Sequence, residues 1–263
     1  MTGLKIDNVS KQFNASNGVL DVLKNINLEI KDGEFVCVVG PSGCGKTTFL
    51  NILAGLEQPT SGRVFHNEKP VNGISSNRLV IFQDLCLFPW LTVQKNVEFG
   101  LKLKKIPKNK REKIAMDYLD MVHLRKFKDS YIHELSGGMK QRVALARALA
   151  IDPEILLMDE PFAALDAQTR DLLHVELQRI WSKTKKTIIF ITHNVREAVC
   201  LGDRVIVFSS LPAEIKASFP VSLKRPRHIE DHGLMEIVRS VLSELRFEIE
   251  KVHKEEMNEK EDN

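Results

Sequence analysis

The stretch EFVCVVGPSGCGKTTFLNILAGL (residues 34–56) decides the fold of this chain. It begins with an apolar run, turns through a glycine-rich loop, and continues from Lys46 with helical apolar spacing until it stops near Gly55. The loop fits the pattern G-x-x-x-x-G-K-[ST], whose glycines let backbone N–H groups turn inward around phosphate oxygens. The start of the helix adds unpaired N–H groups and a partial positive charge. We therefore predict a strand, a phosphate-binding loop and a helix in succession.

The residues of this loop are assigned to nucleotide binding as a group. They are Gly40, Pro41, Ser42, Gly43, Cys44, Gly45, Lys46, Thr47 and Thr48. Lys46 is expected to contact the β- and γ-phosphates, and the Thr47 hydroxyl to bind magnesium. A glycine-rich turn without nucleotide is the alternative, and it fits poorly between a strand and a helix. Cys44 lies beside Lys46 and a helix start, which favour a thiolate, so alkylation there should inactivate the protein and bound nucleotide should protect it.

The segment ILLMDEP (residues 155–161) supplies two carboxylates to the same chemistry. Four apolar residues running into two acids describe a buried strand whose end emerges at the ligand-binding edge of a sheet. Asp159 is expected in or next to the magnesium shell, and Glu160 is placed to polarise a water that attacks the γ-phosphate. The alternative is that both acids cap the next helix. It is weak because Pro161 and a non-helical FAAL come between.

A second Ser-Gly-Gly turn occurs in LSGGMKQR (residues 135–142), far from the phosphate loop. The Ser136 hydroxyl and the N–H groups of Gly137 and Gly138 open a helix, and a helix start of this kind binds anions. Without a lysine it would bind phosphate too weakly to act alone. We interpret it as half of a site whose other half is a phosphate loop. If the two halves cannot meet within one chain, they must meet between two chains.

The order of the predicted elements indicates an α/β fold. Short β-rich runs come first, and a helical pattern dominates from about Thr92 to Ile132. Strands and helices then alternate, which argues for a mostly parallel sheet wrapped by helices. We expect one domain over residues 1–230, with a helical subdomain at about 92–150 inserted in it. A C-terminal helix at 231–252 and a disordered tail at 253–263 follow.

Composition excludes several classes of function. The chain has 263 residues, 43% hydrophobic and 28% charged, and its formal net charge of +3 is too small to argue for nucleic acid. Its four cysteines are scattered without a C-x-x-C pair, so neither a disulfide framework nor a zinc site is expected. No apolar run approaches the roughly 20 residues that cross a bilayer, and the first residues lack a signal-peptide pattern. We expect a cytosolic chain whose membrane role, if any, comes through a partner.

These motifs together resemble a known family. The phosphate loop, LSGGMKQR, ILLMDEP, ALD (residues 164–166) and His193 are, in this order, closely similar to the nucleotide-binding ATPase subunit of ABC transporters. The resemblance covers about the first 210 residues. It implies a P-loop NTPase fold of the ABC ATPase type, with an N-terminal antiparallel β part, that hydrolyses ATP with Mg²⁺. It also implies a head-to-tail dimer in which each ATP lies between one subunit's phosphate loop and residues 136–138 of the other.

The resemblance assigns further residues to the site. Gln83, at the end of LVIFQ, would contact magnesium and report the nucleotide state to the helical subdomain. His193 would contact the γ-phosphate as a catalytic residue, Asp166 would lie across the dimer seam, and Gln141 would join Ser136 in cofactor binding. Phe13 would stack on adenine, at a position where the family often has tyrosine. Taken singly, Gln83 reads as a surface residue, His193 as a helix cap and Phe13 as core.

A narrower resemblance concerns the segments LFPWLTVQKNVEFGL (residues 87–101), THNVREAVCLGDRVIVFSSLPAEI (192–215) and LKRPRH (223–228). They look like the importer ATPases of the nitrate, sulfonate and taurine group, which dock a cytoplasmic helix of an integral membrane permease on the first segment. This implies peripheral attachment at the cytoplasmic face of the cell membrane, solute delivery by a binding protein, and an ATPase pair formed with a second copy or a paralogue. An exporter or lipoprotein-release ATPase, and a soluble ABC-type ATPase of a macromolecular assembly, remain alternatives.

Overall fold

The computed structural model describes residues 2–15 and 18–261, which form two compact units. Unit 1 comprises Met1–Ser75 and Thr187–Asn263, and unit 2 comprises Ser76–Lys186. Unit 2 is wider than the expected helical subdomain at 92–150, because it takes in the strand before that segment and the strand and helix after it. The domain boundaries drawn from the sequence remain predictions.

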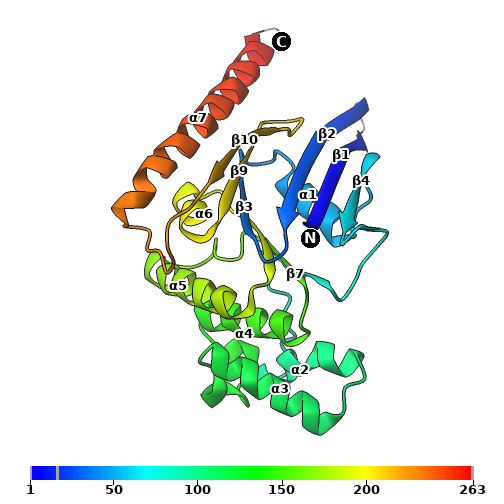
Figure 1. Ribbon diagram of the computed structural model, residues 1–263, viewed down its shortest axis with the longest axis vertical. Coiled ribbons are helices and arrows are strands. Elements are labelled where there is room, and N and C mark those ends of the chain that lie inside the picture. Colours follow the sequence, from blue (N-terminus) through cyan, green and yellow to red (C-terminus); the bar gives the residue numbers. More distant parts are fainter. Residues whose placement is uncertain (1, 16–17, 262–263) are drawn as a thin grey trace. The chain divides into compact units, whose positions relative to one another are not determined.

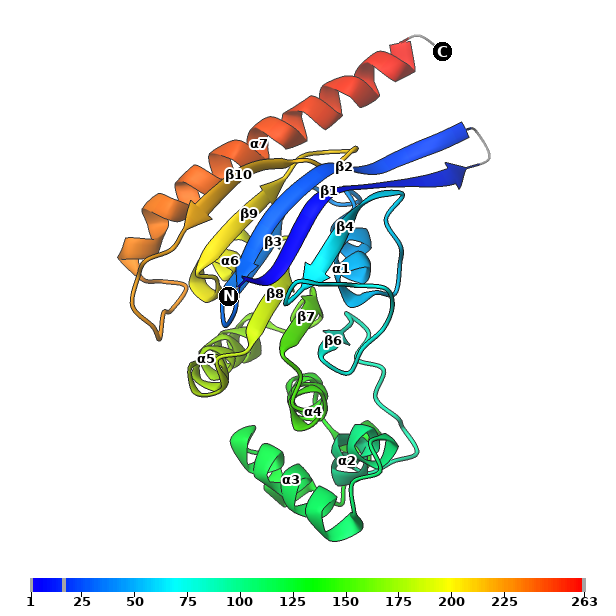
Figure 2. The same ribbon diagram turned by 45° about the vertical axis from the view of Figure 1, so that its right-hand side comes forward.

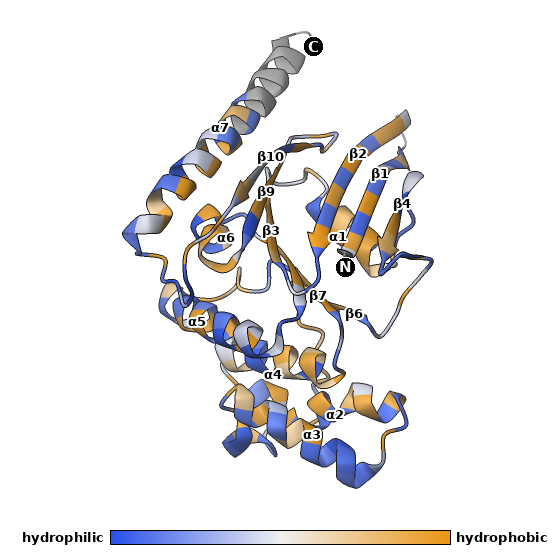
Figure 3. Ribbon diagram, viewed as in Figure 1, coloured by the Kyte–Doolittle hydropathy of each residue, from blue (hydrophilic) through white to orange (hydrophobic). Residues whose placement is uncertain are grey.

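An antiparallel sheet forms the N-terminal part of unit 1 (Figure 1). Its strand order is β2-β1-β4-β5, and the strands span Thr2–Ala15 (β1), Gly18–Lys31 (β2), Ser61–His66 (β4) and Lys69–Pro70 (β5). Buried and exposed residues alternate along the second half of β2, which Figure 3 shows as alternating hydrophilic and hydrophobic bands. This pattern fixes which face of the sheet is covered, because a shift by one residue would turn every apolar side chain to the other face.

A second sheet carries the phosphate loop of unit 1. Strands β9 (Arg204–Phe208), β3 (Phe35–Val39) and β8 (Thr187–Ile191) run parallel, and β10 (Ile215–Pro220) pairs antiparallel with β9. All five residues of β3 and of β8 are buried, as expected for strands covered on both faces. Phe49 and Phe208 meet edge to face with ring centroids 5.2 Å apart, which packs the first helix against the end of this sheet.

Three helices complete unit 1. Helix α1 (Lys46–Ala54) contacts β8, helix α6 (Val195–Leu201) contacts β3, and helix α7 (His232–Glu261) runs beside β10 and α6 (Figure 2). Helix α7 extends nine residues beyond the predicted end at 252, so residues 253–261 are helical where the sequence was expected to be disordered. The reason is that this tail consists largely of glutamate and lysine, which are strong helix formers even without apolar surface to bury.

Unit 2 is mostly helical. Its helices are α2 (Val93–Leu103), α3 (Lys108–Met121), α4 (Gly137–Ala150) and α5 (Ala167–Thr184), with 3-10 turns at Arg125–Phe127 and Ile132–Glu134. Strands β6 (Arg78–Ile81) and β7 (Ile155–Asp159) form a parallel pair. Helix α4 contacts all three of its neighbouring helices, and its alanine-rich sequence lets them approach closely. At Gly100 of α2 a Cβ atom would lie 2.3 Å from Ile151 Cδ1, so a larger residue there would have to displace the Ile151 side chain.

The predicted fold class is confirmed in its essentials. The N-terminal part is antiparallel, the strands that carry the phosphate loop and the two carboxylates are parallel, and helices follow these strands. Two strands were not predicted, namely β5 and β10. Strand β5 has two residues, and β10 alternates half-buried with exposed positions at the edge of its sheet, so neither has a strong apolar pattern.

Candidate functional site

The phosphate loop connects β3 to α1 in a conformation that requires its glycines. Gly43 and Gly45 have positive φ values of 77° and 102°, a region that residues with a Cβ rarely adopt. A Cβ atom at Gly45 would also lie 2.8 Å from Val22 Cγ1. At Gly40 it would lie 3.0 Å from both Cys44 Sγ and Phe208 Cβ. A Cβ would be strained at Gly43 and Gly45 and crowded at Gly40 and Gly45, so the loop conformation favours glycine at these positions.

Lys46 folds back over the loop. Its side chain is 7% exposed, and Nζ donates hydrogen bonds to the carbonyl oxygens of Gly40 (2.9 Å) and Pro41 (2.8 Å). The first N–H groups of α1 have no acceptor within the helix, and its first turn contains no acidic residue. An ammonium group and a row of backbone donors thus lie at the same loop and helix start, which suits the phosphates of a nucleotide. Thr47 is exposed at the same helix start.

Cys44 differs from the prediction that it is a reactive thiolate. Its side chain is 1% exposed, and burial raises the pKa of the thiol even though the charge of Lys46, with Nζ 3.9 Å from Sγ, lowers it. Desolvation outweighs the attraction because the thiolate would lose its hydration. The thiol form therefore dominates at neutral pH, and the expectation of easy alkylation is corrected.

We expect alkylation of Cys44 by N-ethylmaleimide at pH 7 to be at least about tenfold slower than that of the exposed Cys86, because both access and thiolate fraction are lower. The rate at Cys44 should rise as the pH increases toward its raised pKa. Peptide mass spectrometry of partly labelled protein measures both rates in one sample. Labelling of Cys44 as fast as that of Cys86, with protection by ATP, would restore the reactive-thiolate interpretation.

His193 lies at the same sheet edge as the phosphate loop. Strands β3 and β8 are parallel with Val38 opposite Ile191, so Gly40 and His193 follow their strands at equivalent positions. His193 is exposed, and its neighbours fix the turn. Asn194 caps α6 by accepting from the N–H groups of Arg196 and Glu197, at 3.0 and 3.3 Å. His193 is therefore not the helix cap, and it is an exposed residue at the sheet edge where the phosphate loop leaves β3.

Phe13 is not part of the core. It lies on β1 opposite Leu20 and is 37% exposed. Lys11 Nζ lies 4.6 Å from the centroid of its ring and also forms an ion pair of 2.6 Å with Glu57. This arrangement holds the aromatic side chain on the sheet surface, and a partly exposed ring is what an adenine platform requires.

The two carboxylates of ILLMDEP lie at the end of a buried strand in unit 2. All five residues of β7 are buried, and Asp159 is 8% exposed. Glu160 has a φ of 43°, an uncommon conformation for a residue with a side chain, and such strain often marks functional positions. The helix that follows begins at Ala167 and is capped by Asp166. The alternative that Asp159 and Glu160 cap this helix is therefore wrong.

Gln83 follows β6 at the same edge as these carboxylates. The parallel pairing places Ile81 opposite Met158, so continuation of the register brings Gln83 level with Glu160. Gln83 is exposed, as a residue at the carboxyl edge of a sheet should be if it is to contact a ligand. Unit 2 thus brings together Gln83, Asp159 and Glu160, three of the residues assigned from the sequence to magnesium binding and catalysis.

Ser136 and the two glycines after it form the start of α4. Ser136 Oγ accepts from the N–H of Met139 at 3.4 Å, so the serine is the helix cap. A Cβ atom at Gly138 would lie 2.5 Å from Thr169 Cγ2, in the first turn of α5, so a larger residue there would have to displace the Thr169 side chain. Gln141 differs from its assignment to nucleotide binding, because only 4% of it is exposed and it belongs to the interior of unit 2.

Asp166 has a structural role at the start of α5. Its carboxylate accepts from the N–H of Thr169 at 3.0 Å. This hydrogen bond lowers the pKa of Asp166, so the side chain is ionised at neutral pH. Asp166 is exposed, and it lies close to the Ser136 motif through the contact between Gly138 and Thr169. The start of α4 after Ser136 and the first turn of α5, which Asp166 caps, therefore lie close together in unit 2.

Sequence reasoning missed the residues that hold the aromatic segment after Gln83. Asn96 is fully buried, accepts from the N–H of Phe88 (2.9 Å) and donates to the carbonyls of Phe88 and Leu91. Arg147 of α4 donates to the carbonyls of Leu85 and Cys86. A polar residue within the apolar face of a helix was the available signal in both cases. The result is a fixed segment at residues 85–91 on which Trp90 is 71% exposed.

Magnesium can be held by the residue types present. No group of three or more histidine, cysteine or acidic side chains that could hold a metal occurs among the residues that the structure describes. Mg²⁺ in nucleotide sites commonly takes one or two protein ligands, with phosphate oxygens and water completing an octahedron. A hydroxyl such as that of Thr47 and a carboxylate such as that of Asp159 suit this role.

Within residues 2–15 and 18–261, no helix combines the length and the hydropathy needed to span a bilayer.

Comparisons with known proteins agree with this chemistry. The family model described as "ABC transporter" matches residues 23–163. An ABC transporter ATP-binding protein of Methanocaldococcus jannaschii, itself uncharacterized, is 52% identical over 246 residues, which is 94% of this chain and 92% of the relative. The nitrate import ATP-binding protein of Synechocystis is 49% identical over 84% of this chain and 83% of its own length. The taurine import ATP-binding protein of Roseobacter denitrificans is 47% identical over 83% and 82%.

A solved structure gives the same result for the fold. An ATP-binding cassette in a dimeric post-hydrolysis state, bound to ADP and phosphate, matches with a TM-score of 0.73 and 35% identity. The match covers 84% of this chain and all of that cassette. The phosphate loop of unit 1 and the carboxylates of unit 2 are thus set in the fold that the motifs implied. The chain belongs to the ABC transporter family, in which it is an ATP-binding cassette that hydrolyses ATP.

Proposed function

We propose that this ATPase powers the uptake of a small solute, such as a sulfonate, taurine or nitrate, through integral membrane permease subunits. A solute-binding protein would deliver the solute, and the ATPase would lie at the cytoplasmic face of the membrane. The nitrate and taurine import relatives, at 49% and 47% identity, support the importer assignment. Nucleotide chemistry cannot separate importers from exporters or from soluble assembly ATPases, because all of them hydrolyse ATP. The distinction has to come from the surface that meets the partner.

The observation that carries the proposal is the exposure of Trp90 on a rigid segment. A tryptophan that is 71% exposed is unusual unless it meets a partner, and Trp is enriched at the centres of protein interfaces. The Phe88 ring supports the Trp90 ring, with their centroids 5.6 Å apart. Phe88 in turn packs on the ring of Phe99, with centroids 4.3 Å apart. Since Asn96 and Arg147 fix the backbone beneath, the segment is preorganised for docking. A helix of a permease is the partner that we propose for it.

Within the catalytic cycle we assign the following roles. Lys46 and the loop N–H groups would hold the phosphates. Thr47, Gln83 and Asp159 would be ligands of Mg²⁺, which would neutralise charge on the phosphates. Glu160 accepts the proton of the attacking water, and His193 contacts the γ-phosphate. Two cassettes, either two copies of this chain or one copy and a paralogue, would close head to tail, so that Ser136 of one faces the loop of the other.

Helix α4 offers a route from nucleotide to permease. Its first residues follow Ser136, and Arg147, almost three turns further along, holds the docking segment through the carbonyls of Leu85 and Cys86. Any displacement of the helix start would move the docking segment with it, because the helix is continuous over this length. We propose that closure of the dimer moves α4 and that this movement switches the permease.

The test is an affinity purification of the tagged chain from gently solubilised native membranes, with mass spectrometry of the proteins that accompany it. We expect a multi-spanning permease in about equal amount. The permease should not be recovered with Trp90→Asp, because a carboxylate would have to be buried in the interface. Leu103→Asp is the matched control, since Leu103 is 70% exposed in the same unit but outside the docking segment.

Two outcomes would contradict the proposal. Recovery of the wild-type chain without any membrane protein would favour the ATPase of a soluble assembly. Equal recovery of the permease with Trp90→Asp and with the wild-type chain would remove Trp90 from the interface. The solute then follows from a direct measurement. The purified complex in proteoliposomes should show ATPase stimulation only when the binding protein carries its solute, and sulfonates, taurine and nitrate are tested in turn.

A further inference from the structure

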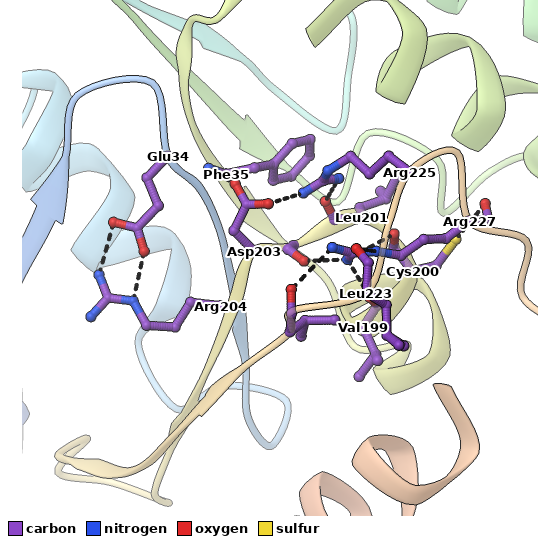
Figure 4. A network of polar contacts seen from close by, with 12 residues as sticks. Glu34, Phe35, Val199, Cys200, Leu201, Asp203, Arg204, Leu223, Arg225 and Arg227 are labelled. Atoms are coloured by element: carbon purple, nitrogen blue, oxygen red, sulfur yellow. Dashed lines mark hydrogen bonds and ion pairs between the residues drawn. The ribbon is translucent and has the colours of Figure 1, made fainter. Parts of the chain in front are cut away.

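The C-terminal end of α6 is held by two arginines from the segment LKRPRH (residues 223–228), as Figure 4 shows. The last carbonyl groups of a helix have no partner within it. Here the carbonyls of residues 199–202 all accept hydrogen bonds from guanidinium groups. Arg227 bonds those of Val199, Cys200 and Gly202, and Arg225 bonds that of Leu201. The positive charges of these two arginines also interact favourably with the partial negative charge that the helix dipole places at this end.

Arg227 is an unusually complete clamp. It is 2% exposed and donates to five backbone carbonyls, since it also reaches Val221 (3.1 Å) and Leu223 (3.0 Å). Burial lowers the pKa of Arg227 to about 10, and the charge of Arg225 contributes to the same direction. The guanidinium is still protonated at pH 7. A buried charge of this kind is costly unless it is fully hydrogen-bonded, so the site is built around it.

Arg225 connects the same helix end to β3. It forms an ion pair of 2.6 Å with Asp203, whose other carboxylate oxygen accepts from the N–H of Phe35 at 3.0 Å. The guanidinium also lies 5.5 Å from the centre of the Phe35 ring. Phe35 is the first residue of β3, and β3 leads directly into the phosphate loop. The arginine pair therefore connects α6 to β3, the strand that leads into the phosphate loop.

The opposite end of α6 begins at Val195, two residues after His193. Asn194 caps the helix, Thr192 Oγ accepts from the N–H of Asn194 at 3.0 Å, and Thr192 also donates to the buried Glu197. These bonds attach the turn that contains His193 to the first turn of α6. The helix has seven residues, or about 10 Å, so it is a short rigid link between the arginine pair and His193.

We infer that Arg225 and Arg227 are positioning residues that set His193 relative to the phosphate loop, acting through α6 and β3. The inference rests on the proposed role of His193 at the γ-phosphate. It goes beyond a general stabilising role, because the pair contacts the two elements that carry the loop and the histidine. Lysine cannot substitute, since a point charge with three donors cannot reproduce a planar fork that reaches five carbonyls.

The experiment compares Arg227→Lys with Arg204→Lys in the full chain. Arg204 is the matched control because it lies on β9 and its guanidinium bonds Glu34 at 2.8 Å and the carbonyl of Glu29 at 2.6 Å (Figure 4 shows the pair with Glu34). We expect Arg227→Lys to lower kcat for ATP about tenfold to a hundredfold while KM changes less than about twofold, because a small displacement of a reacting group affects the transition state more than binding. Arg204→Lys should retain the wild-type kcat. Melting temperatures of both variants show that the assays are run on folded protein.

A His193→Ala background separates positioning from general destabilisation. If Arg227 acts through His193, adding Arg227→Lys to His193→Ala should lower kcat no further. If Arg227→Lys lowers kcat by the same factor in the wild-type chain and in His193→Ala, the inference is overturned. An unchanged kcat for Arg227→Lys alone would overturn it as well. If His193→Ala by itself leaves kcat unchanged, the proposed role of His193 fails, and the inference fails with it. If Arg227→Lys does not fold, Arg225→Lys takes its place, and its effect on kcat is measured in the same double-mutant cycle with His193→Ala.

Discussion

Glu160→Gln should bind ATP normally and hydrolyse it at least about a hundredfold more slowly than the wild-type chain, the loss expected when a general base is removed. Glutamine has nearly the same shape as glutamate, so the turn with its φ of 43° at residue 160 is preserved. What is lost is the carboxylate that accepts the proton of the attacking water. Single-turnover hydrolysis with a radiolabelled γ-phosphate measures the chemical step directly.

The same substitution should trap a closed dimer. Because Glu160→Gln retains the phosphate loop and the Ser136 motif, ATP can still join two chains, and hydrolysis no longer separates them. Size-exclusion chromatography with ATP and Mg²⁺ should show a dimer for Glu160→Gln and a monomer for the wild-type chain. Glu154→Gln is the matched control, since Glu154 lies just before β7 and hydrogen-bonds Asn77 at 2.6 Å. Hydrolysis at the wild-type rate by Glu160→Gln would show that the base has been assigned wrongly.

The sequence predicted those parts of the site that depend on local chemistry. A glycine-rich turn between an apolar strand and a helix is recognisable because its conformation is set by the glycines themselves, as the φ values of Gly43 and Gly45 show. The strand before Asp159 was equally predictable, because an unbroken apolar run of this kind is typical of a strand that is buried on both faces. Both features are encoded within about ten neighbouring residues.

The parts that sequence reasoning missed depend on contacts between distant residues. Cys44 looked reactive from its neighbours in the sequence, but in the fold it is only 1% exposed. Arg227 bonds Val199, which is 28 residues away, and nothing local distinguishes it from a surface arginine before a loop. Asn96 bonds the backbone of Phe88, in the loop before its helix, and the sequence does not show this contact. Burial of a polar group is a tertiary property, so a polar residue on the apolar face of a helix signals it without showing which contacts satisfy that residue.

Ser136→Arg has the second large expected effect, because it should abolish ATP hydrolysis without weakening ATP binding to the single chain. The phosphate loop is in unit 1 and is unchanged by the substitution. The long cationic side chain would occupy the helix start that is proposed to meet the other subunit's nucleotide. Loss of the cap to the N–H of Met139 costs about 1 kcal/mol and does not explain such a loss. Thr92→Arg is the matched control, since Thr92 caps α2 with the same 3.4 Å hydrogen bond.

Mixing variants gives the sharpest test of a site shared between chains. Lys46→Ala damages the phosphate loop and Ser136→Arg damages the opposing helix start, so each variant alone should be inactive. In a head-to-tail heterodimer of the two, both defects fall in one site and the other site is intact. Random pairing leaves about a quarter of all sites intact, so ATPase activity should reappear when the two inactive proteins are mixed. Two sites that each lie within one chain could not recover in this way, because every chain in the mixture carries its own defect.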